Sequence, residues 1–307
     1  MEEFVKEFEQ EVQRNDHETP EAIIAIQSLI KYIEQSNVGT LQQLIEELQE
    51  LSSLLKSAAG TSTTSVVSGC DLFVRFITLM RNRHMGPVDS DIWESKSFDP
   101  VRCFLLDRGN QFMKRLMMSR KKIAQLAYPF ITDEVTVLTV NLSRVVLEIL
   151  SKAHDKMKKF HVLVTVSEPD KEGAMMVKAL RDRGIQATQI LDCSIGFVME
   201  RVDFILVGAV GVVENGGLIN KIGTYPVAVM AKSLNKPFYV AVESFKFYRN
   251  YPLCQLDLPN DSKYLTNEEK GHPTVDFTPP NLINKLFTDL GVLTPSAVSD
   301  ELIKLYI

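Results

Sequence analysis

The chain contains few of the residues that hold metal ions or cross-link proteins outside the cell. Its 307 residues include four cysteines and five histidines, all widely spaced, and no two cysteines form a CxxC pair. Disulfide frameworks and zinc sites both need closer, patterned spacing. We therefore expect free thiols in a reducing cytosol and no bound metal.

An excess of basic residues is also absent, because 34 Lys and Arg residues are outnumbered by 39 Asp and Glu residues. The net charge of −5 gives no general electrostatic basis for binding nucleic acid directly. No apolar run is long enough to span a bilayer, and the acidic start MEEFVKEFEQEVQ is unlike a signal or transit peptide. These absences favour a cytoplasmic protein that binds neither membranes nor nucleic acid.

The first 130 residues carry apolar side chains at helical spacing, which predicts a helical domain over residues 1–130. Thr40 with Gln43 forms a capping-box pattern, and Asp99-Pro100 is typical of the start of a long helix. Ser68 and Asp71 are expected to open another helix within this domain.

From residue 131 onward, short β-branched runs alternate with helical patterns. The expected strands are Val135–Val140, Val162–Val166, Ala187–Leu191, Phe204–Ala209 and Phe238–Val242. Strands that are apolar on both faces and alternate with helices indicate a parallel sheet covered on both sides. The prediction is an α/β chain, in which the helical domain precedes a Rossmann-like, doubly wound domain over residues 131–307.

Ligands of such sheets bind beyond the carboxyl ends of the strands. Asn141, Ser143 and Arg144 follow the first expected strand, where a helix start could hold a phosphate. The glycine-rich turn expected over Val207–Thr224 leads to Asn220-Lys221, a neutral donor and a point charge suited to phosphate. The predicted pocket combines these five residues. An N-cap with a solvated arginine explains Ser143 and Arg144 equally well, and Asn220-Lys221 could form a surface turn.

A basic cluster lies on the long helix that begins at Asp99-Pro100. Its central residues are Arg120, Lys121 and Lys122. Such a cluster is most simply a solvated helix face, and the alternative is a partner-binding patch.

Three stretches carry a family resemblance: NGGLINKIGTY over residues 215–225, VESFKF over 242–247 and TDLGVLTPSAVS over 288–299. They resemble the family of the alpha, beta and delta subunits of eukaryotic translation initiation factor 2B, most closely its alpha members. More distant relatives are isomerases of methylthioribose 1-phosphate or ribose 1,5-bisphosphate. The resemblance covers nearly the whole chain.

The resemblance also implies which chemistry is missing. The isomerases carry a catalytic Cys after the first strand and an acid–base Asp in the glycine-rich segment, where this chain has Asn141 and Gly217. Ring opening and hydrogen transfer need a proton-accepting side chain, which an amide and a hydrogen do not supply. Glu168 also replaces the usual residue after the second strand, and in a dry pocket it would repel phosphate.

By resemblance, the chain is a non-catalytic regulatory subunit of the guanine-nucleotide exchange complex for initiation factor 2. The resemblance implies three kinds of partner. A second copy of the chain would be joined through the C-terminal domain inside a decamer, which also contains the beta, gamma, delta and epsilon subunits. The helical domain would sense the phosphorylated alpha subunit of initiation factor 2. No cofactor is expected, and the small ligand suggested is a sugar phosphate. The alternative is an active sugar-phosphate isomerase. A nicotinamide-dependent enzyme is disfavoured because no GxGxxG follows the first strand.

Overall fold

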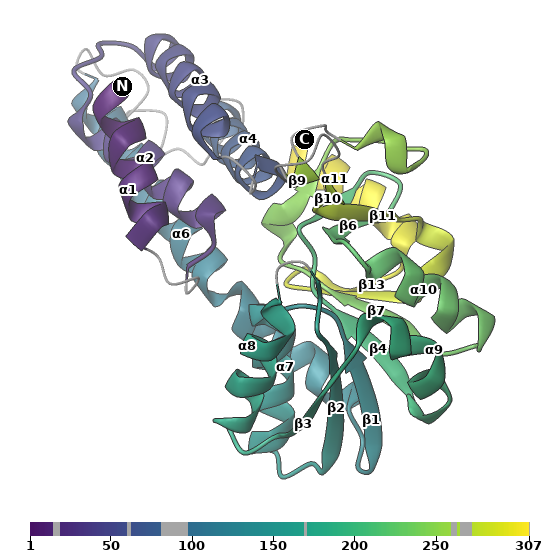
Figure 1. Ribbon diagram of the computed structural model, residues 1–307. Helices are drawn as coiled ribbons and strands as arrows, with labels where there is room; N and C mark the ends of the chain where they lie inside the picture. Colours follow the sequence, from purple (N-terminus) through teal and green to yellow (C-terminus); the bar gives the residue numbers. More distant parts are fainter. Residues whose placement is uncertain are drawn as a thin grey trace. The chain divides into compact units, whose positions relative to one another are not determined.

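The computed structural model describes residues 1–14, 19–59, 63–80, 98–168, 171–258, 263–264 and 272–306. The chain forms two compact units, a helical unit of Met1–Met117 with Lys304–Ile307, and a sheet unit of Met118–Ile303. The predicted fold class, a helical N-terminal part followed by a Rossmann-like α/β part, is confirmed (Figure 1).

The helical unit is built from amphipathic helices around an apolar core. Its helices are α1 (Glu2–Arg14), α2 (Glu21–Gln35), α3 (Leu41–Ala58), α4 (Thr63–Met80) and the first part of α6 (Asp99–Ala127). Leu29, Leu48 and Phe73 are fully buried, and the Phe73 and Phe112 rings lie 5.8 Å apart. Each helix buries one apolar stripe, which explains why the spacing of apolar residues predicted helices in this part of the sequence.

Two predicted helix starts can be compared with the structure. Thr40 caps α3, because its hydroxyl accepts a hydrogen bond from the Gln43 backbone N–H at 3.2 Å. The prediction for Ser68 is wrong, since this buried residue lies inside α4, five residues after its start. A Cβ at the neighbouring Gly69 would lie 2.9 Å from Ala22 Cβ, so the small residues here allow α4 to pack closely on α2.

The sheet unit contains a seven-stranded sheet in the order β13-β12-β7-β4-β1-β2-β3. Its strands are β1 (Val135–Thr139), β2 (Phe160–Thr165), β3 (Gln186–Ile190), β4 (Phe204–Val207), β7 (Phe238–Ala241), β12 (Lys285–Thr288) and β13 (Gly291–Leu293). All neighbours pair in parallel except β12 and β13. The six parallel strands, from β12 to β3 in this order, therefore have the doubly wound Rossmann arrangement. The direction of winding reverses between β1 and β4.

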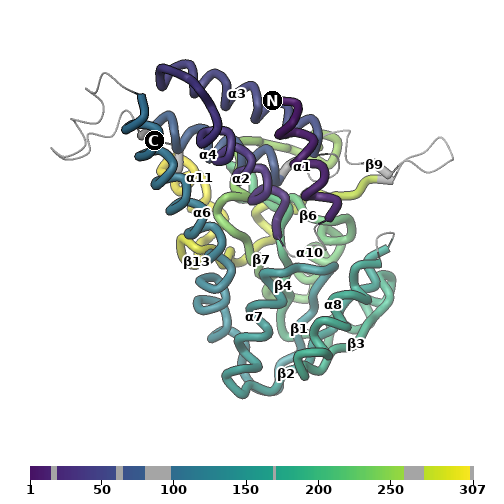
Figure 2. Tube along the Cα trace, turned by 90° about the vertical axis from the view of Figure 1, so that its left-hand side faces the viewer, coloured from purple at the N-terminus to yellow at the C-terminus, as the bar shows by residue number. Residues whose placement is uncertain are grey.

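Helices cover both faces of this sheet (Figures 1 and 2). On one face, α7 (Arg144–Asp155), α8 (Glu172–Arg181) and the end of α6 bury apolar residues in one core. On the other, α10 (Thr224–Ser233) packs on β4, β7 and the short α9 (Ile195–Val198).

The segment Val207–Thr224 was predicted to be a glycine-rich turn, and the structure differs. It forms a hairpin of β5 (Gly211–Val213) and β6 (Leu218–Lys221), within a second sheet of order β11-β6-β5-β8. The other strands of that sheet are β8 (Phe247–Tyr248) and β11 (Val275–Thr278). The hairpin forms because its valine, leucine and isoleucine side chains are buried against β8 and β11.

The remaining elements are short, apart from α11 (Val298–Tyr306). They are the strands β9 (Lys263–Tyr264) and β10 (His272–Pro273) and the 3₁₀ turns at Tyr128–Phe130, Asp192–Ser194, Met199–Arg201, Ser244–Lys246, Gln255–Asp257, Pro280–Leu282 and Pro295–Ala297.

The domain boundary was predicted at residue 130, and α6 ends at Ala127. The two compact units, however, divide inside α6, between Met117 and Met118. The difference arises because Ile123, Ala124 and Ala127 of α6 are buried in the core of the sheet unit. Across the described residues, none of the helices has both the length and the apolar character needed to cross a membrane.

Candidate functional site

The ends of β1 and β2 are joined by two residues with left-handed backbone conformation. Asn141 has φ 60° and Ser167 has φ 63°, and both are buried. The Asn141 N–H donates to Ser167 Oγ at 2.9 Å, and Ser167 Oγ lies 2.7 Å from Thr165 Oγ1. A left-handed conformation is uncommon for residues other than glycine. At Asn141 it is held by the hydrogen bond to Ser167, which fixes this residue at the carboxyl edge of the sheet.

Ser143 has the capping role that the sequence left open. Its hydroxyl accepts a hydrogen bond from the Val146 N–H at 3.4 Å, at the start of α7. A Cβ at Gly208, directly after β4, would lie 2.2 Å from Ser143 Oγ. Glycine is therefore required where the ends of β1 and β4 meet, at the reversal point of the sheet.

Beside this point, the buried carboxylate of Glu243 contacts Arg120 and Lys246, and Arg144 acts on Lys246 as a further like charge. We call Arg120, Arg144, Glu243 and Lys246 the Glu243 cluster. Arg120 Nε donates to Glu243 Oε1 at 3.0 Å, and Lys246 Nζ lies 3.0 Å from Glu243 Oε2. Lys246 Nζ also donates to the Ala209 carbonyl at 2.9 Å, which ties the ends of β4 and β7 together.

Burial and neighbouring charges shift the pKa values of Glu243 and Lys246. Burial by itself would raise the pKa of Glu243, but the charges of Lys246 and Arg120 lower that pKa to about 2. Burial lowers the pKa of Lys246, Glu243 opposes this, and the like charges of Arg144 and Arg120 lower it further. Glu243 is therefore held ionised by its ion pairs with Arg120 and Lys246.

The second group of predicted residues lies at the start of α10. Asn220 Nδ2 donates to Thr224 Oγ1 at 3.0 Å, and Lys221 Nζ lies 3.5 Å from Glu172 Oε1 at the start of α8. Asn220 also stands opposite Asp276 in the β6–β11 pairing. Lys221 therefore has an internal carboxylate partner in this structure.

Asp276 is a buried carboxylate that is hydrogen-bonded to backbone N–H groups. Its Oδ2 accepts hydrogen bonds from the Gly223 N–H at 2.8 Å and the Tyr225 N–H at 2.9 Å. Burial raises the pKa of Asp276 to about 7, although these backbone N–H groups act in the opposite direction. Asp276 satisfies the first backbone donors of α10 from a neighbouring strand.

The basic run on α6 separates into two environments. Lys121 and Lys122 are exposed, whereas Arg120 is directed to Glu243. Arg120 therefore differs from the expected solvated face, because helical periodicity turns this one position towards the sheet.

Two residues that the family resemblance singled out lie in unexpected surroundings. The Glu168 side chain is 57% exposed and lies 3.7 Å from Lys171, so it does not lie in a dry pocket in this structure. A Cβ at Gly217 would lie 2.5 Å from Phe277 Cε2, and Phe277 belongs to the core of the second sheet. The Gly217 position therefore faces a packed aromatic ring.

Sequence reasoning did not assign Glu243, Lys246 or Asp276 to a site. The first two stood in a resemblance motif, directly after the fifth expected strand. The carboxyl-end rule applied to that strand would have identified them. Asp276 carried no such signal, because only the pairing of β11 with β6 brings it to the start of α10.

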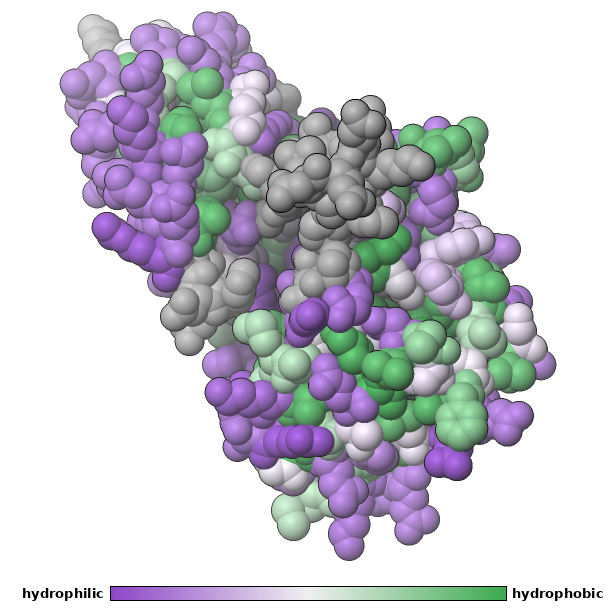
Figure 3. All heavy atoms as spheres, viewed as in Figure 1, coloured by the Kyte–Doolittle hydropathy of each residue, from purple (hydrophilic) through white to green (hydrophobic). Residues whose placement is uncertain are grey.

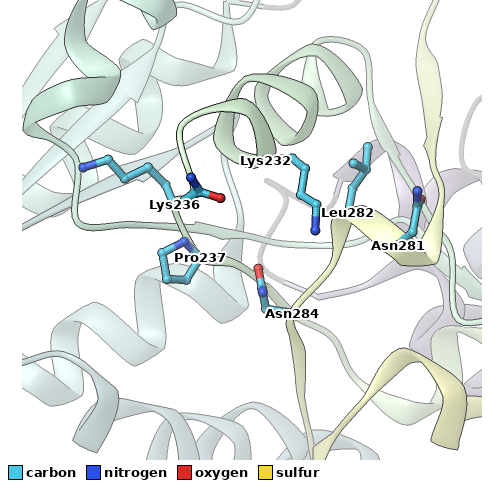
Figure 4. A pocket seen from close by; sticks show the side chains of 7 residues that line it. Lys232, Lys236, Pro237, Asn281, Leu282 and Asn284 are labelled. Atoms are coloured by element: carbon cyan, nitrogen blue, oxygen red, sulfur yellow. The ribbon is translucent and has the colours of Figure 1, made fainter.

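A separate pocket lies at the opposite, amino ends of β7 and β12. It is lined by Lys232, Asn235, Lys236, Pro237, Asn281, Leu282 and Asn284. Figure 4 shows Lys232 and Asn284 extending towards the same space, and Lys236 donates to the Glu200 carbonyl at 3.1 Å. None of the predicted ligand residues lines this pocket.

A family model described as the Initiation factor 2 subunit family matches residues 14–295. A Dictyostelium discoideum protein, translation initiation factor eIF2B subunit alpha, is 42% identical, and the match covers 98% of this chain and 96% of that protein. A ribose 1,5-bisphosphate isomerase from Archaeoglobus fulgidus is 32% identical, covering 66% of this chain and 68% of the isomerase.

A solved structure gives the same fold. The crystal structure of the tetrameric eIF2B-beta2-delta2 complex from C. thermophilum contains a chain that matches with a TM-score of 0.79. The match covers 98% of this chain and 94% of that chain at 21% identity, so it supports the architecture alone.

Proposed function

This chain belongs to the Initiation factor 2 subunit family, and we propose that it is an alpha-type regulatory subunit of the guanine-nucleotide exchange complex for initiation factor 2. It would act in translation initiation in the cytosol. The observation that carries this proposal is the near full-length match to an eIF2B alpha subunit, whereas the isomerase match covers about two thirds of the chain.

The proposed regulatory role is tested by nucleotide release from initiation factor 2. Exchange complexes with and without this chain are compared on substrate that is phosphorylated or unphosphorylated on its alpha subunit. Without the chain, inhibition by phosphorylation is expected to be lost while most basal exchange remains. Loss of exchange on unphosphorylated substrate, or inhibition that persists without the chain, contradicts the proposal.

Catalytic silence is the second part of the proposal. Asn141 and Gly217 stand where the isomerase resemblance has a Cys and an Asp, and Phe277 fills the space that a side chain at Gly217 would need. Purified chain mixed with ribose 1,5-bisphosphate or methylthioribose 1-phosphate is expected to yield no ketose. Ketose formation that disappears in the Asn141→Ala variant would establish the alternative, an active isomerase.

The proposed partners are a second copy of this chain, bound through the sheet unit, and the beta, gamma, delta and epsilon subunits. Support comes from large apolar side chains left exposed on that unit, including Phe197, Leu253 and Leu256. On the face in Figure 3, hydrophobic residues are interspersed with hydrophilic ones. Sedimentation is expected to give a dimer mass, and a monomer at micromolar concentration would contradict the homodimer.

The phosphorylated alpha subunit of initiation factor 2 is proposed to meet the helical unit and the exposed basic side chains of α6. A phosphoserine carries nearly two negative charges and pairs well with such residues. Lys121 and Lys122 are exposed and suited to this contact, whereas Arg120 is held by Glu243.

A phosphate pocket without catalysis is the second candidate function, with a sugar phosphate as its ligand. The α7 start at Arg144 and the Lys221 ammonium favour it. Calorimetry with ribose 1,5-bisphosphate is expected to show binding that weakens about tenfold in Lys221→Ala, equivalent to about 1.4 kcal/mol. Lys171→Ala, which removes a largely exposed lysine, is the matched control. Absence of heat with the wild type would reject the pocket.

A further inference from the structure

The pocket at the amino ends of β7 and β12 is not used by the proposed function. Its volume is about 150 Å³, and a cavity of about that volume can hold a molecule as large as benzene. Its walls come from the end of α10 with the loop that follows it, and from the turn Pro280–Leu282 with the segment before β12. All of these residues belong to the sheet unit, so the pocket is formed within one compact part of the chain.

The pocket presents cationic side chains, and among the described residues that line it none is acidic. Lys232 lies in the last turn of α10, and within the described part of the chain its ammonium has no hydrogen-bond or ion-pair partner. Lys236 is directed to the Glu200 carbonyl, 3.1 Å away. Lys232 is therefore the cation that a ligand would meet, and an ammonium binds acceptor groups only.

The orientation of the Asn284 carboxamide follows from the strand start beside it. Its Oδ1 accepts a hydrogen bond from the N–H of Phe238, the first residue of β7, at 2.7 Å. A backbone N–H only donates, so the oxygen must face it and the Nδ2 group remains as a donor. In β1 an aspartate makes the same kind of contact, because Asp203 Oδ2 accepts from the Thr136 N–H at 2.7 Å. Asparagine at position 284 makes the contact without adding negative charge to the pocket.

The end of α10 does not offer free carbonyl groups that would oppose an anion. The Asn235 N–H donates to the Lys232 carbonyl at 3.2 Å, and the Lys236 N–H donates to the Ala231 carbonyl at 2.8 Å. Asn235 has φ 54°, the left-handed conformation that commonly ends a helix. The terminal carbonyl groups are thus bonded within the chain, and two lysines outweigh the weak, screened negative end of the helix dipole.

We propose that this pocket binds a carboxylate group, with Lys232 Nζ and Asn284 Nδ2 as its donors. Figure 4 shows these two side chains extending towards the same space. A carboxylate has two acceptor oxygens, one for the ammonium and one for the carboxamide, and one ammonium balances its single charge. Pro237 and Leu282 provide an apolar lining for the carbon chain that carries it. A small free carboxylate and an acidic side chain of a protein both supply this chemistry.

Nuclear magnetic resonance on the full, isotope-labelled chain tests the site. Sodium propionate is compared with sodium chloride at equal ionic strength, and the amide signals of Lys236, Leu282 and Asn284 are followed. The wild type is expected to show saturable shifts in the millimolar range, because so small a ligand makes few contacts. Lys232→Gln is expected to weaken binding about tenfold, because it removes a charge-assisted hydrogen bond. Lys178→Gln, which removes an exposed lysine from the last turn of α8, is the matched control and should bind like the wild type.

The Asn284→Asp variant separates ligand binding from folding. The new carboxylate can still accept the Phe238 N–H, so thermal melting should stay close to that of the wild type. It also places a negative charge in the pocket, so propionate binding should be lost. If this variant is unfolded, Lys232→Gln decides the test, because its side chain is exposed. Absence of saturable shifts in the wild type, binding that is unchanged in Lys232→Gln, or full binding in a folded Asn284→Asp protein each overturns the site.

Two further probes identify the class of ligand. A short blocked peptide containing glutamate is compared with its glutamine counterpart and with propionate. Tighter binding of the glutamate peptide than of propionate assigns the site to an acidic side chain of a protein, and equal or weaker binding assigns it to a small free carboxylate. Equal binding of the two peptides, or tighter binding of inorganic phosphate than of propionate, overturns the assignment to a carboxylate. The regulatory and phosphate-pocket proposals depend on other residues, so they fail separately from this one.

Discussion

Two carboxylates of the sheet unit, Glu243 and Asp276, are almost equally buried but have opposite protonation behaviour. The pKa of Glu243 is lowered to about 2, and the pKa of Asp276 is raised to about 7. Burial raises both pKa values, so burial alone does not explain the difference. The difference comes from the partners: Glu243 has two cationic side chains, and Asp276 has backbone N–H groups.

The comparison indicates what each part of the site contributes. At Glu243, two cationic side chains pair with the buried carboxylate, and Lys246 joins the ends of β4 and β7. The surroundings of Asp276 provide a fixed start for α10, next to Asn220 and Lys221. Glu243 therefore belongs to an ion-pair cluster, and Asp276 caps a helix.

The largest expected effect is on the pH dependence of stability at Asp276. Its folded pKa lies above the unfolded value of 3.8, so the stability it contributes is complete below pH 3.8 and is lost as pH rises to 7. A shift of about three pKa units corresponds to roughly 4 kcal/mol. In Asp276→Asn, the free energy of unfolding is expected to lose this decline between pH 4 and 7, measured by urea denaturation against the wild type.

Glu243 provides the contrast to this behaviour. Its folded pKa lies below the unfolded value of 4.5, so its stabilisation is present above pH 4.5 and is lost as pH falls to 2. Glu243→Gln should therefore leave the decline between pH 4.5 and 7 unchanged. Equal pH profiles for wild type and Asp276→Asn would show that Asp276 is ionised normally.

Removing one cation from the Glu243 cluster should produce the next largest effect. Lys246→Met leaves Glu243 buried with Arg120 as its remaining cationic contact, and breaking such a pair costs about 3 kcal/mol at neutral pH. Chemical denaturation measures the loss, and the exposed Lys178→Met is the control. Adding Glu243→Gln to Lys246→Met should restore part of the stability, because it removes the uncompensated charge. A Lys246→Met protein as stable as the control contradicts this interpretation.

A smaller effect is expected next to Asp276, at Gly217. In Gly217→Ala the new Cβ would lie 2.5 Å from Phe277 Cε2, and Phe277 is buried. Overpacking of this kind costs about 2 kcal/mol, which thermal and chemical denaturation would detect. Gly39→Ala is the matched control, because no heavy atom outside its own chain neighbours lies within 4 Å of its Cβ position. Equal stability of the two variants would mean that the second sheet can move away from the residue.

The smallest effect is expected for the exposed lysines of α6. Lys121→Ala and Lys122→Ala should change stability by no more than about 0.5 kcal/mol, because both side chains are exposed. Arg120→Ala should cost clearly more, although all three residues are adjacent in the sequence. Denaturation of the three variants side by side checks the difference between a surface contact and a buried one.

Much of the fold followed from local patterns. Five strands were predicted because apolar runs act over a few residues, and the α7 cap at Ser143 was one of two interpretations that the sequence left open. The predicted turn over Val207–Thr224 was wrong, because the pairing of β6 with β11 joins residues more than fifty positions apart. Ser68 was misread as a cap because it is buried inside α4, next to Gly69, where α4 packs on Ala22 of α2.

The sequence by itself determined the fold class, the family and the residue types that chemistry at this site has available. The tertiary structure decided which of them act together. Arg120, between a buried serine and two exposed lysines, is paired with a carboxylate 123 positions away. Asp276 became a helix cap through strand pairing. Charge and burial are properties of the surroundings in space, and local sequence patterns do not specify which distant segments provide them.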